Sequence, residues 1–371
     1  MHILFACGGT GGHINPALAV AGYIREHHPD ARISFIGNRK GMEATLVPKA
    51  GYDFYPIDVA GFQRKISLVN IGRNADAFVK MFKSSFQSSK LLKNLAPDVV
   101  VGMGGYVSGP VLRKAHQLGI KTATHEQNAF PGVTTKMLLK YVDTVMLAMP
   151  DARLRLPQDR EYVITGNPVR GEILRADRAS ARAHFGMDDR IMILSFGGSL
   201  GAKRINEAVA SLIADHAGSG KFYHYHATGK FGIEWMPDLL KEKGVDLSKC
   251  PEIRMTEYID DMDLCMAAAD LVICRAGAIT LSELETMGRA SVLIPSPNVA
   301  ENHQYHNAMT LVNRKAAAVI EEKDLTDEKL IDVVNELTKR KDILDSMGKK
   351  AAEMAITDAS KRIYDEIIKL L

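Results

Sequence analysis

The chain has 371 residues, of which 46% are hydrophobic and 25% are charged, and these proportions are typical of a globular protein. A formal net charge of +3 is too small to predict a nucleic-acid partner, and no apolar run reaches the ~20 residues of a membrane span. The amino-terminus lacks the basic and apolar regions of a signal peptide, and the four cysteines lack metal-binding spacing, so we expect two cytoplasmic domains with reduced thiols.

Short apolar runs alternate with helix-length segments along the chain, and most of these runs end at Gly, Pro or Asn. This alternation is typical of a parallel sheet with helices on both faces. In the first half we expect strands at Ile3–Cys7, Arg32–Ile36, Asp53–Ile57, Val99–Val101, Lys121–His125, Thr144–Leu147 and Tyr162–Ile164. In the second half we expect strands at Ile191–Phe196, Tyr223–Thr228, Ile253–Thr256, Leu271–Cys274, Ser291–Ile294 and Ala317–Ile320. The predicted fold class is therefore α/β, with two Rossmann-like, doubly wound parallel sheets.

The turn segment Gly166–Arg170 follows the last strand of the first half and marks the expected domain boundary. We accordingly predict one domain at residues 1–165 and a second at 166–341. Residues 342–371 have a helical hydrophobic period with an apolar stripe. We expect this terminal segment to pack across the domain junction or back on the first domain.

A turn rich in glycine, Gly8–Gly12, stands between the first strand and the first helix. Such a turn directs backbone N–H groups toward an anion, and the helix adds its positive end. His13 places a titratable group beside this backbone, which indicates chemistry as well as binding. A similar turn, Gly197–Gly201, opens the second half. Because ligands bind outside the carboxyl ends of parallel strands, two facing sheets would present these turns on opposite walls of one cleft.

Seven motifs occur in the order seen in the MurG family of bacterial N-acetylglucosaminyltransferases, which the chain therefore resembles. They are Gly8–His13, Gly102–Tyr106, His125–Asn128, Gly166–Arg170, Gly197–Ser199, Arg275–Ala278 and Glu301–Ala308. The resemblance implies a GT-B fold and UDP-N-acetylglucosamine as the donor. It implies as acceptor lipid I, in which undecaprenyl diphosphate carries N-acetylmuramyl-pentapeptide. Inverting transfer to the C4 hydroxyl would give lipid II for peptidoglycan synthesis.

Sugar transfer from a nucleotide diphosphate needs a base for the acceptor hydroxyl and stabilisation of the departing UDP. His13 has the chemistry of a base and the matching position in the family motif, although a histidine there could simply cap the helix. His125 and Glu126 end another predicted strand and could orient or replace that base, and the sequence does not rank the three. We expect Asn128 to reach the same active site and assign catalysis to His13, Glu126 and Asn128.

Donor binding is assigned mainly to the second half. Ser199 and its glycine turn would donate hydrogen bonds to the diphosphate, and Arg170 would supply the positive charge that a metal otherwise provides. The resemblance implies that Glu283 accepts the ribose hydroxyls, although it could be an ordinary surface glutamate of a helix. The resemblance also implies donor contacts at Thr10, Gly11, Gly12, Asn128, Ile259 (uracil), Ala278, Ile279, Thr280, Gln304 and Asn307 (sugar hydroxyls). His303 stands where some family members have glutamine.

The acceptor diphosphate is assigned to the two glycine turns of the first half. The residues expected there are Gly9, Gly11, Gly12, Gly104, Gly105 and Tyr106. Asp261-Met262-Asp263 matches the D-x-D pattern of metal-dependent glycosyltransferases, but Asp before a helix is an ordinary N-cap. We therefore expect no metal and no cofactor.

A predicted helix between Val69 and Leu95 mixes aromatic residues with lysines. This composition suits either an anionic membrane surface or an amphipathic core helix with a solvated basic face, and a lipid-borne acceptor favours the membrane. The contacts expected are Phe78, Lys80, Phe82, Lys83 and Phe86. The expected location is peripheral, on the cytoplasmic face of the plasma membrane, with cell-wall synthesis proteins as possible partners.

Three other classes share this architecture. A non-hydrolysing UDP-N-acetylglucosamine epimerase would need neither a lipid acceptor nor the basic aromatic helix. A non-catalytic nucleotide-sugar sensor would have no need of a base. A diacylglycerol glycosyltransferase has an acceptor without a diphosphate, so it gives no reason for the Gly102–Gly105 turn. An inverting, metal-independent glycosyltransferase therefore remains the favoured prediction.

Overall fold

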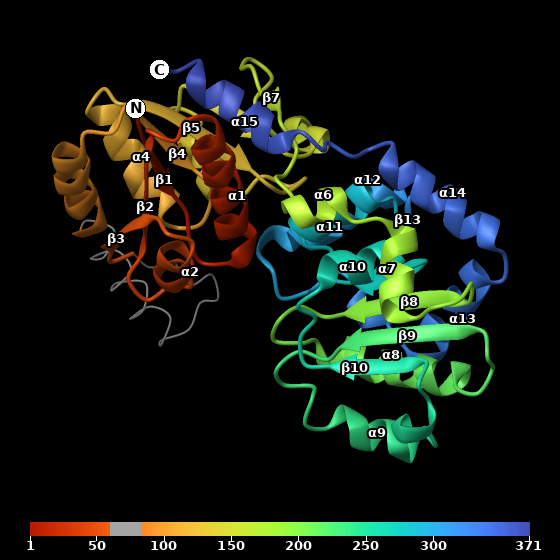
Figure 1. The fold of residues 1–371 in the computed structure, drawn as a ribbon. Helices are drawn as coiled ribbons and strands as arrows, with labels where there is room; N and C mark the ends of the chain where they lie inside the picture. The colour runs from red at the N-terminus through yellow and green to blue at the C-terminus, as the bar shows by residue number, and fades with distance from the viewer. Residues whose placement is uncertain (60–82) are drawn as a thin grey trace. The chain divides into compact units, whose positions relative to one another are not determined.

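The computed structural model describes residues 1–59 and 83–371, which form two compact units (Figure 1). Unit 1 contains Met1–Val169 and Asp358–Leu371, and unit 2 contains Arg170–Thr357. The last fourteen residues of the chain, Asp358–Leu371, therefore belong to unit 1 although they follow unit 2 in the sequence.

The sheet of unit 1 has seven parallel strands in the order β3-β2-β1-β4-β5-β6-β7. The strands are β1 (His2–Ala6), β2 (Arg32–Asn38), β3 (Asp53–Ile57), β4 (Val99–Gly102), β5 (Lys121–Glu126), β6 (Thr144–Leu147) and β7 (Val163–Ile164). The helices of unit 1 include α1 (Gly11–His27), α2 (Glu43–Lys49), α4 (Ser108–Gln117), α5 (Val133–Leu138), η1 (Pro150–Arg155) and α15 (Ala359–Ile368). Residues 83–95 are also helical.

The central strand β1 contributes to a hydrophobic core on each face of the sheet. Successive side chains of a strand point to opposite sides, and both sides of β1 are covered. Ile3 and Phe5 belong to a core cluster that also contains Ile363 and Ile367 of α15. Leu4 belongs to a second cluster on the other side of the sheet. A strand with two buried faces needs apolar residues at every position, which explains the unbroken apolar run in the sequence.

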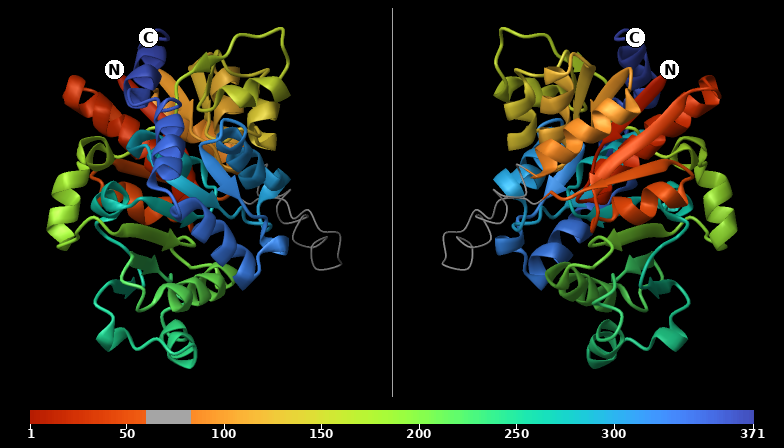
Figure 2. Two further views of the ribbon diagram at one scale, coloured as in Figure 1. Left: turned by 90° about the vertical axis from the view of Figure 1, so that its right-hand side faces the viewer. Right: turned by 90° about the vertical axis from the view of Figure 1, so that its left-hand side faces the viewer.

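The sheet of unit 2 has six parallel strands in the order β10-β9-β8-β11-β12-β13. They are β8 (Ile191–Phe196), β9 (Phe222–Ala227), β10 (Ile253–Thr256), β11 (Leu271–Cys274), β12 (Ala290–Leu293) and β13 (Ala317–Val319). The helices are α6 (Gly171–Arg175), α7 (Arg178–Phe185), α8 (Lys203–His216), α9 (Met236–Glu242), η2 (Leu247–Lys249), α10 (Met262–Ala268), α11 (Ala278–Met287), η3 (Ala300–Asn302), α12 (His303–Val312), η4 (Glu322–Asp324), α13 (Asp327–Thr338) and α14 (Lys341–Ala352). Helices cover both faces of each sheet (Figure 2).

This architecture confirms the predicted fold class, two doubly wound parallel sheets. All thirteen predicted strands are present, and their observed ends differ from the predicted ones by no more than two residues.

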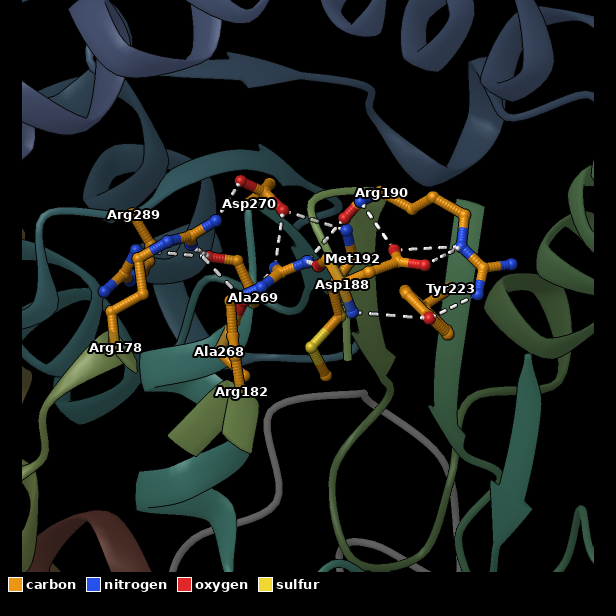
Figure 3. Close-up of polar contacts among 10 residues, drawn as sticks. All are labelled: Arg178, Arg182, Asp188, Arg190, Met192, Tyr223, Ala268, Ala269, Asp270 and Arg289. Carbon is orange, nitrogen blue, oxygen red and sulfur yellow. Dashed lines mark hydrogen bonds and ion pairs between the residues drawn. The ribbon is translucent and has the colours of Figure 1, made fainter. Parts of the chain in front are cut away.

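Two arginines of α7 form ion pairs and hydrogen bonds with the turn between α10 and β11 (Figure 3). Arg178 and Arg182 form ion pairs with Asp270 at 2.6 and 3.1 Å. Arg182 also donates to the Ala268 carbonyl at 3.0 Å, where the negative end of the α10 dipole favours a cation. Asp270 accepts the Met192 amide at 2.9 Å, so the same carboxylate connects α7 to the start of β8.

Candidate active site

Two glycine turns of unit 1 meet at the carboxyl ends of the neighbouring strands β1 and β4. A Cβ atom on Gly105 would lie 2.3 Å from the Gly8 carbonyl oxygen, and one on Gly104 would lie 2.5 Å from the His13 ring. Gly104 and Gly105 also have φ values of +97° and +80°, which other residues rarely adopt. Both positions therefore require glycine, because the turns approach closely and the backbone is left-handed.

His13 lies in the first turn of α1 and is half buried. Its Nδ1 atom is 3.1 Å from the Gly8 carbonyl oxygen and 3.3 Å from Thr10 Oγ1. Because a carbonyl oxygen can only accept, the proton must be on Nδ1, which leaves the lone pair on Nε2. The ring bonds a carbonyl group here, whereas a helix N-cap accepts from backbone N–H groups. This orientation is compatible with the predicted role of His13 as a base.

His125 is buried and uses both ring nitrogens within unit 1. Its Nε2 lies 2.9 Å from the Gly166 carbonyl oxygen, and its Nδ1 lies 3.0 Å from the Gln127 side-chain nitrogen. Burial lowers the pKa of His125 to about 4, since the interior disfavours the charged form. His125 is therefore neutral at physiological pH and held within a hydrogen-bond network.

Glu126 is buried, and its carboxylate accepts four hydrogen bonds from the loop after β5 and the first turn of α5. Oε1 accepts the backbone and side-chain N–H groups of Asn128 at 3.0 and 3.1 Å. Oε2 accepts the Gly132 amide at 2.9 Å and the Thr135 hydroxyl at 2.5 Å. The carboxylate thereby orders the loop after β5 and orients Asn128.

The predicted ligands of the acceptor diphosphate differ in what they can donate. Gly11 and Gly12 begin α1, where backbone N–H groups have no partner within the helix. Tyr106 is 60% exposed beside the second turn. The Gly9 amide instead donates to the Glu43 carboxylate at 3.2 Å. The sequence analysis did not identify Glu43, because its contacts with Gly8, Gly37 and Gly41 form only in the fold.

In unit 2, the predicted Gly197–Gly201 turn follows β8, and Ser199 is exposed on it. Gly201 has a φ of +83°, and a Cβ atom there would lie 2.2 Å from the Thr228 carbonyl oxygen. The turn leads into α8, so its amides lie at a helix start that favours an anion.

The structure pairs two residues to which the sequence assigns separate roles. Arg170 Nε lies 3.6 Å from Glu283 Oε1, with the arginine side chain 47% exposed and the glutamate side chain 11% exposed. Burial raises the pKa of Glu283, and the Arg170 charge opposes that rise. The predicted diphosphate ligand therefore lies against the predicted ribose ligand.

The other predicted donor ligands of unit 2 lie around the same edge of its sheet, whereas Thr10, Gly11, Gly12 and Asn128 belong to unit 1. Ala278, Ile279 and Thr280 form the first turn of α11. Ile259, after β10, is only 1% exposed. Gln304 accepts the Ser296 amide at 2.9 Å, and the buried Asn307 donates to the Ala276 carbonyl at 3.2 Å. These two amide side chains hold neighbouring loops in place.

The predicted D-x-D motif coincides with a helix start. Asp261 is at the N-cap position of α10, and Asp263 lies in its first turn. Within residues 1–59 and 83–371, no three His, Cys, Asp or Glu side chains gather as metal ligands.

The predicted membrane helix is only partly described. Phe78, Lys80 and Phe82 lie outside the described residues. Lys83 forms an ion pair with Asp58 at 2.8 Å, and Phe86 is 74% exposed. Across the described part of the chain, no helix is both long enough and apolar enough to cross a bilayer.

Two Rossmann-like units with glycine turns at their strand ends, one of them beside a histidine, form the architecture of the GT-B class of glycosyltransferases. Residues 3–147 match the Glycosyltransferase family 28 N-terminal domain, and residues 192–363 match the Glycosyltransferase family 28 C-terminal domain.

Named relatives extend this match to the full length. The chain is 44% identical over 370 residues to the UDP-N-acetylglucosamine--N-acetylmuramyl-(pentapeptide) pyrophosphoryl-undecaprenol N-acetylglucosamine transferase of Acetivibrio thermocellus, covering 100% of this chain and 98% of the relative. The transferase of the same name from Ruminiclostridium cellulolyticum is 42% identical, with 100% of both chains covered.

Solved structures agree. The crystal structure of Acinetobacter baumannii MurG matches with a TM-score of 0.81 and 31% identity, covering 99% of both chains. UDP-GlcNAc 2-epimerase from Neisseria meningitidis, bound to UDP-GlcNAc, matches with a TM-score of 0.65 at 14% identity over 100% of both chains, and this likeness concerns the fold alone. The chain belongs to glycosyltransferase family 28 and, within it, to the MurG family.

Proposed function

We propose that the protein transfers N-acetylglucosamine from UDP-N-acetylglucosamine to the C4 hydroxyl of the N-acetylmuramyl group of lipid I, giving lipid II. Family membership supports the reaction, since the transferases matched over the full length carry these substrates in their names. The observation that carries the chemistry is His13, whose proton is held on Nδ1 by the Gly8 carbonyl beside two joined glycine turns.

In the proposed reaction, His13 Nε2 takes the proton of the acceptor hydroxyl as its oxygen attacks C1 of the donor sugar. The bond from C1 to the UDP oxygen breaks, and its electron pair leaves with the diphosphate. Attack opposite to the leaving group inverts C1 and gives a β-linkage. Glu126 acts in this proposal by orienting Asn128, because its oxygens already accept four hydrogen bonds.

Donor binding is proposed for unit 2. The amides of the Gly197–Gly201 turn and Ser199 would hold the diphosphate at the start of α8. Arg170 contacts Glu283 through Nε, and its other guanidinium N–H groups remain donors that suit a phosphate. Glu283 would accept the ribose hydroxyls, which are neutral donors compatible with a buried carboxylate.

Acceptor binding is proposed for unit 1, where Gly11, Gly12 and the Gly104–Gly105 turn would hold the lipid diphosphate. We infer a peripheral position on the cytoplasmic face of the plasma membrane, because the acceptor is lipid-borne. The exposed Phe86 supports an apolar contact there, and Lys83, although paired with Asp58, is 59% exposed. Proteins of cell-wall synthesis are the proposed partners.

The test is incubation of the purified protein with radiolabelled UDP-N-acetylglucosamine and a lipid I analogue, with and without EDTA. We expect label on the lipid in both samples. His13→Gln should abolish most transfer, whereas His184→Gln, which changes an exposed histidine of α7, should leave it intact. Epimerisation of the donor without transfer would refute the proposal in favour of an epimerase. Loss of transfer in EDTA, restored by a divalent cation, would refute the metal-independent mechanism.

A further inference from the structure

A buried carboxylate lies directly behind the first glycine turn of unit 1. Glu43, the first residue of α2, has 0% exposed surface. Its Oε2 accepts the Gly9 amide at 3.2 Å, and its Oε1 accepts the Asn38 amide at 2.7 Å. Gly9 follows β1 and Asn38 ends the neighbouring β2. One carboxylate therefore joins the carboxyl ends of two strands.

Three glycines form the socket for this side chain. A Cβ atom on Gly8 would lie 2.2 Å from Glu43 Oε1, one on Gly37 would lie 2.4 Å from Cγ, and one on Gly41 would lie 2.3 Å from Oε2. Any of these Cβ atoms would overlap the carboxylate or its stem. Glycine therefore occupies three separate positions where any side chain would clash with one buried carboxylate, and this indicates a specific role for that carboxylate.

The peptide group between Gly8 and Gly9 connects this carboxylate to His13. Its N–H donates to Glu43, and its carbonyl oxygen, which belongs to Gly8, accepts from His13 Nδ1 at 3.1 Å. The hydrogen bonds therefore run in series from carboxylate to peptide to imidazole. Hydrogen bonds in series polarise one another, so a negative charge on Glu43 strengthens the carbonyl as an acceptor for the Nδ1 proton.

We propose that Glu43 is a positioning residue for His13, which it acts on through the Gly8–Gly9 peptide. It holds the proton on Nδ1 and stabilises the imidazolium that forms when Nε2 takes the proton of the acceptor hydroxyl. No proton moves along the series. The effect on turnover rests on the proposed function, because it requires His13 to be the base, but the effect on the imidazole does not.

Burial shifts the pKa values of two other titratable groups near this edge of the sheet away from neutral pH. Burial, together with the Glu43 charge, raises the pKa of the Cys7 thiol. Burial lowers the pKa of His125 to about 4. Glu126 accepts four hydrogen bonds from the loop after β5 and the first turn of α5, and Tyr106 is exposed on the neighbouring turn. Neither Cys7 nor His125 therefore changes its charge near neutral pH, so neither adds a step there to a titration of the His13 ring.

The test compares Glu43→Gln with the unaltered full-length protein. Glutamine keeps the size of the side chain, but its amide NH₂ would face one of the two backbone donors. Asp98→Asn is the matched control, because Asp98 accepts the His2 amide at 2.7 Å at the opposite end of β1. The measurements are the pH dependence of kcat and the NMR titration of histidine rings, with the His13 signal identified by its loss in His13→Gln.

Glu43→Gln should move the acidic midpoint of both titrations to lower pH by about one pH unit, because the imidazolium loses a nearby negative charge. The plateau value of kcat should fall about tenfold, as expected for a weaker and less oriented base. The KM for the lipid acceptor should not rise, since a negative charge behind an anion site has been removed. Asp98→Asn should move neither midpoint.

An unchanged ring midpoint in Glu43→Gln would overturn the proposal. A ring midpoint that moves while the kcat profile does not would support the connection to His13 and refute the base role of His13, which belongs to the proposed function. If Glu43→Gln does not fold, the ¹⁵N shifts of the His13 ring in the unaltered protein decide. A proton on Nδ1 supports the proposal, and a proton on Nε2 overturns it.

Discussion

Replacing Gly105 with alanine should damage the active site through a contact between two turns, beyond its effect on the local backbone. The φ of Gly105 is +80°, and this left-handed conformation costs a residue with a Cβ atom about 1–2 kcal/mol. The new Cβ would also lie 2.3 Å from the Gly8 carbonyl oxygen. Because ordinary contacts of this kind are longer by roughly 1 Å, the turns must separate by about that distance.

Gly8 is the residue whose carbonyl holds His13, so the separation displaces the proposed base. A misplacement of about 1 Å can cost on the order of 100-fold in rate, and we expect a loss of that size in kcat. Gly119→Ala is the matched control, because Gly119 has a φ of +73° and no atom within 4 Å of its Cβ position. This control should show the backbone cost alone, about 1–2 kcal/mol, with full activity.

Scanning calorimetry and the lipid transfer assay measure the two effects on the same preparations. We expect Gly105→Ala to unfold at a lower temperature than Gly119→Ala and to lose activity even well below its unfolding temperature. If the two variants are equally stable and equally active, the contact between the turns has no role in holding His13.

Three further predictions concern unit 2 and buried histidines. Glu283→Gln should raise the KM for UDP-N-acetylglucosamine about tenfold with little change in kcat, because a charge-assisted hydrogen bond to the ribose is lost; an unchanged donor KM would contradict the ribose assignment. Asp270→Asn should lower the free energy of unfolding by about 3 kcal/mol, since two arginines lose their partner, and a melting temperature equal to that of the unaltered protein would contradict it. Burial lowers the pKa of His226 to about 3, so the unfolded chain binds more protons there than the folded one, and stability should fall as the pH drops from about 6.5. Denaturation followed through Trp235, the single tryptophan, tests this in unit 2, and a stability that stays constant between pH 6.5 and 4 would refute it.

The strands could be predicted from the sequence because a strand that is buried on both faces requires a continuous run of apolar residues. In β1 every residue is apolar or buried, and the run ends at a glycine turn. The turn at Gly8–Gly12 and its histidine are likewise neighbours in the sequence, so their association required no knowledge of the fold.

Contacts between segments that are distant in the sequence produce no such local pattern. Glu43 is 34 positions from Gly9, and in the sequence it is an ordinary acidic residue at a helix start. The pairing of Arg170 with Glu283 joins two distant segments of the sequence, and the two residues were assigned different parts of the donor for that reason. The hydrogen bonds of Glu126 are formed with residues nearby in the sequence. An acidic residue at the end of a strand, however, is equally compatible with a catalytic base and with a residue that orders the following loop, so the sequence alone did not distinguish the two roles.

Glu43 places a negative charge behind a turn that is proposed to bind a diphosphate, and this has two opposing effects. The Glu43 carboxylate accepts the hydrogen bond of the Gly9 amide, so that amide cannot donate to the diphosphate, and its negative charge weakens the electrostatic attraction of the turn for an anion. That cost applies equally to the bound substrate and to the transition state, because the lipid diphosphate keeps its charge throughout. In the proposed mechanism, by contrast, the imidazolium of His13 forms only as the acceptor proton is removed, so its stabilisation by Glu43 is specific to the transition state. Only interactions that strengthen in the transition state accelerate the chemical step. The buried carboxylate therefore lowers affinity for the acceptor in exchange for a faster transfer, which suits an enzyme whose acceptor is concentrated in a membrane.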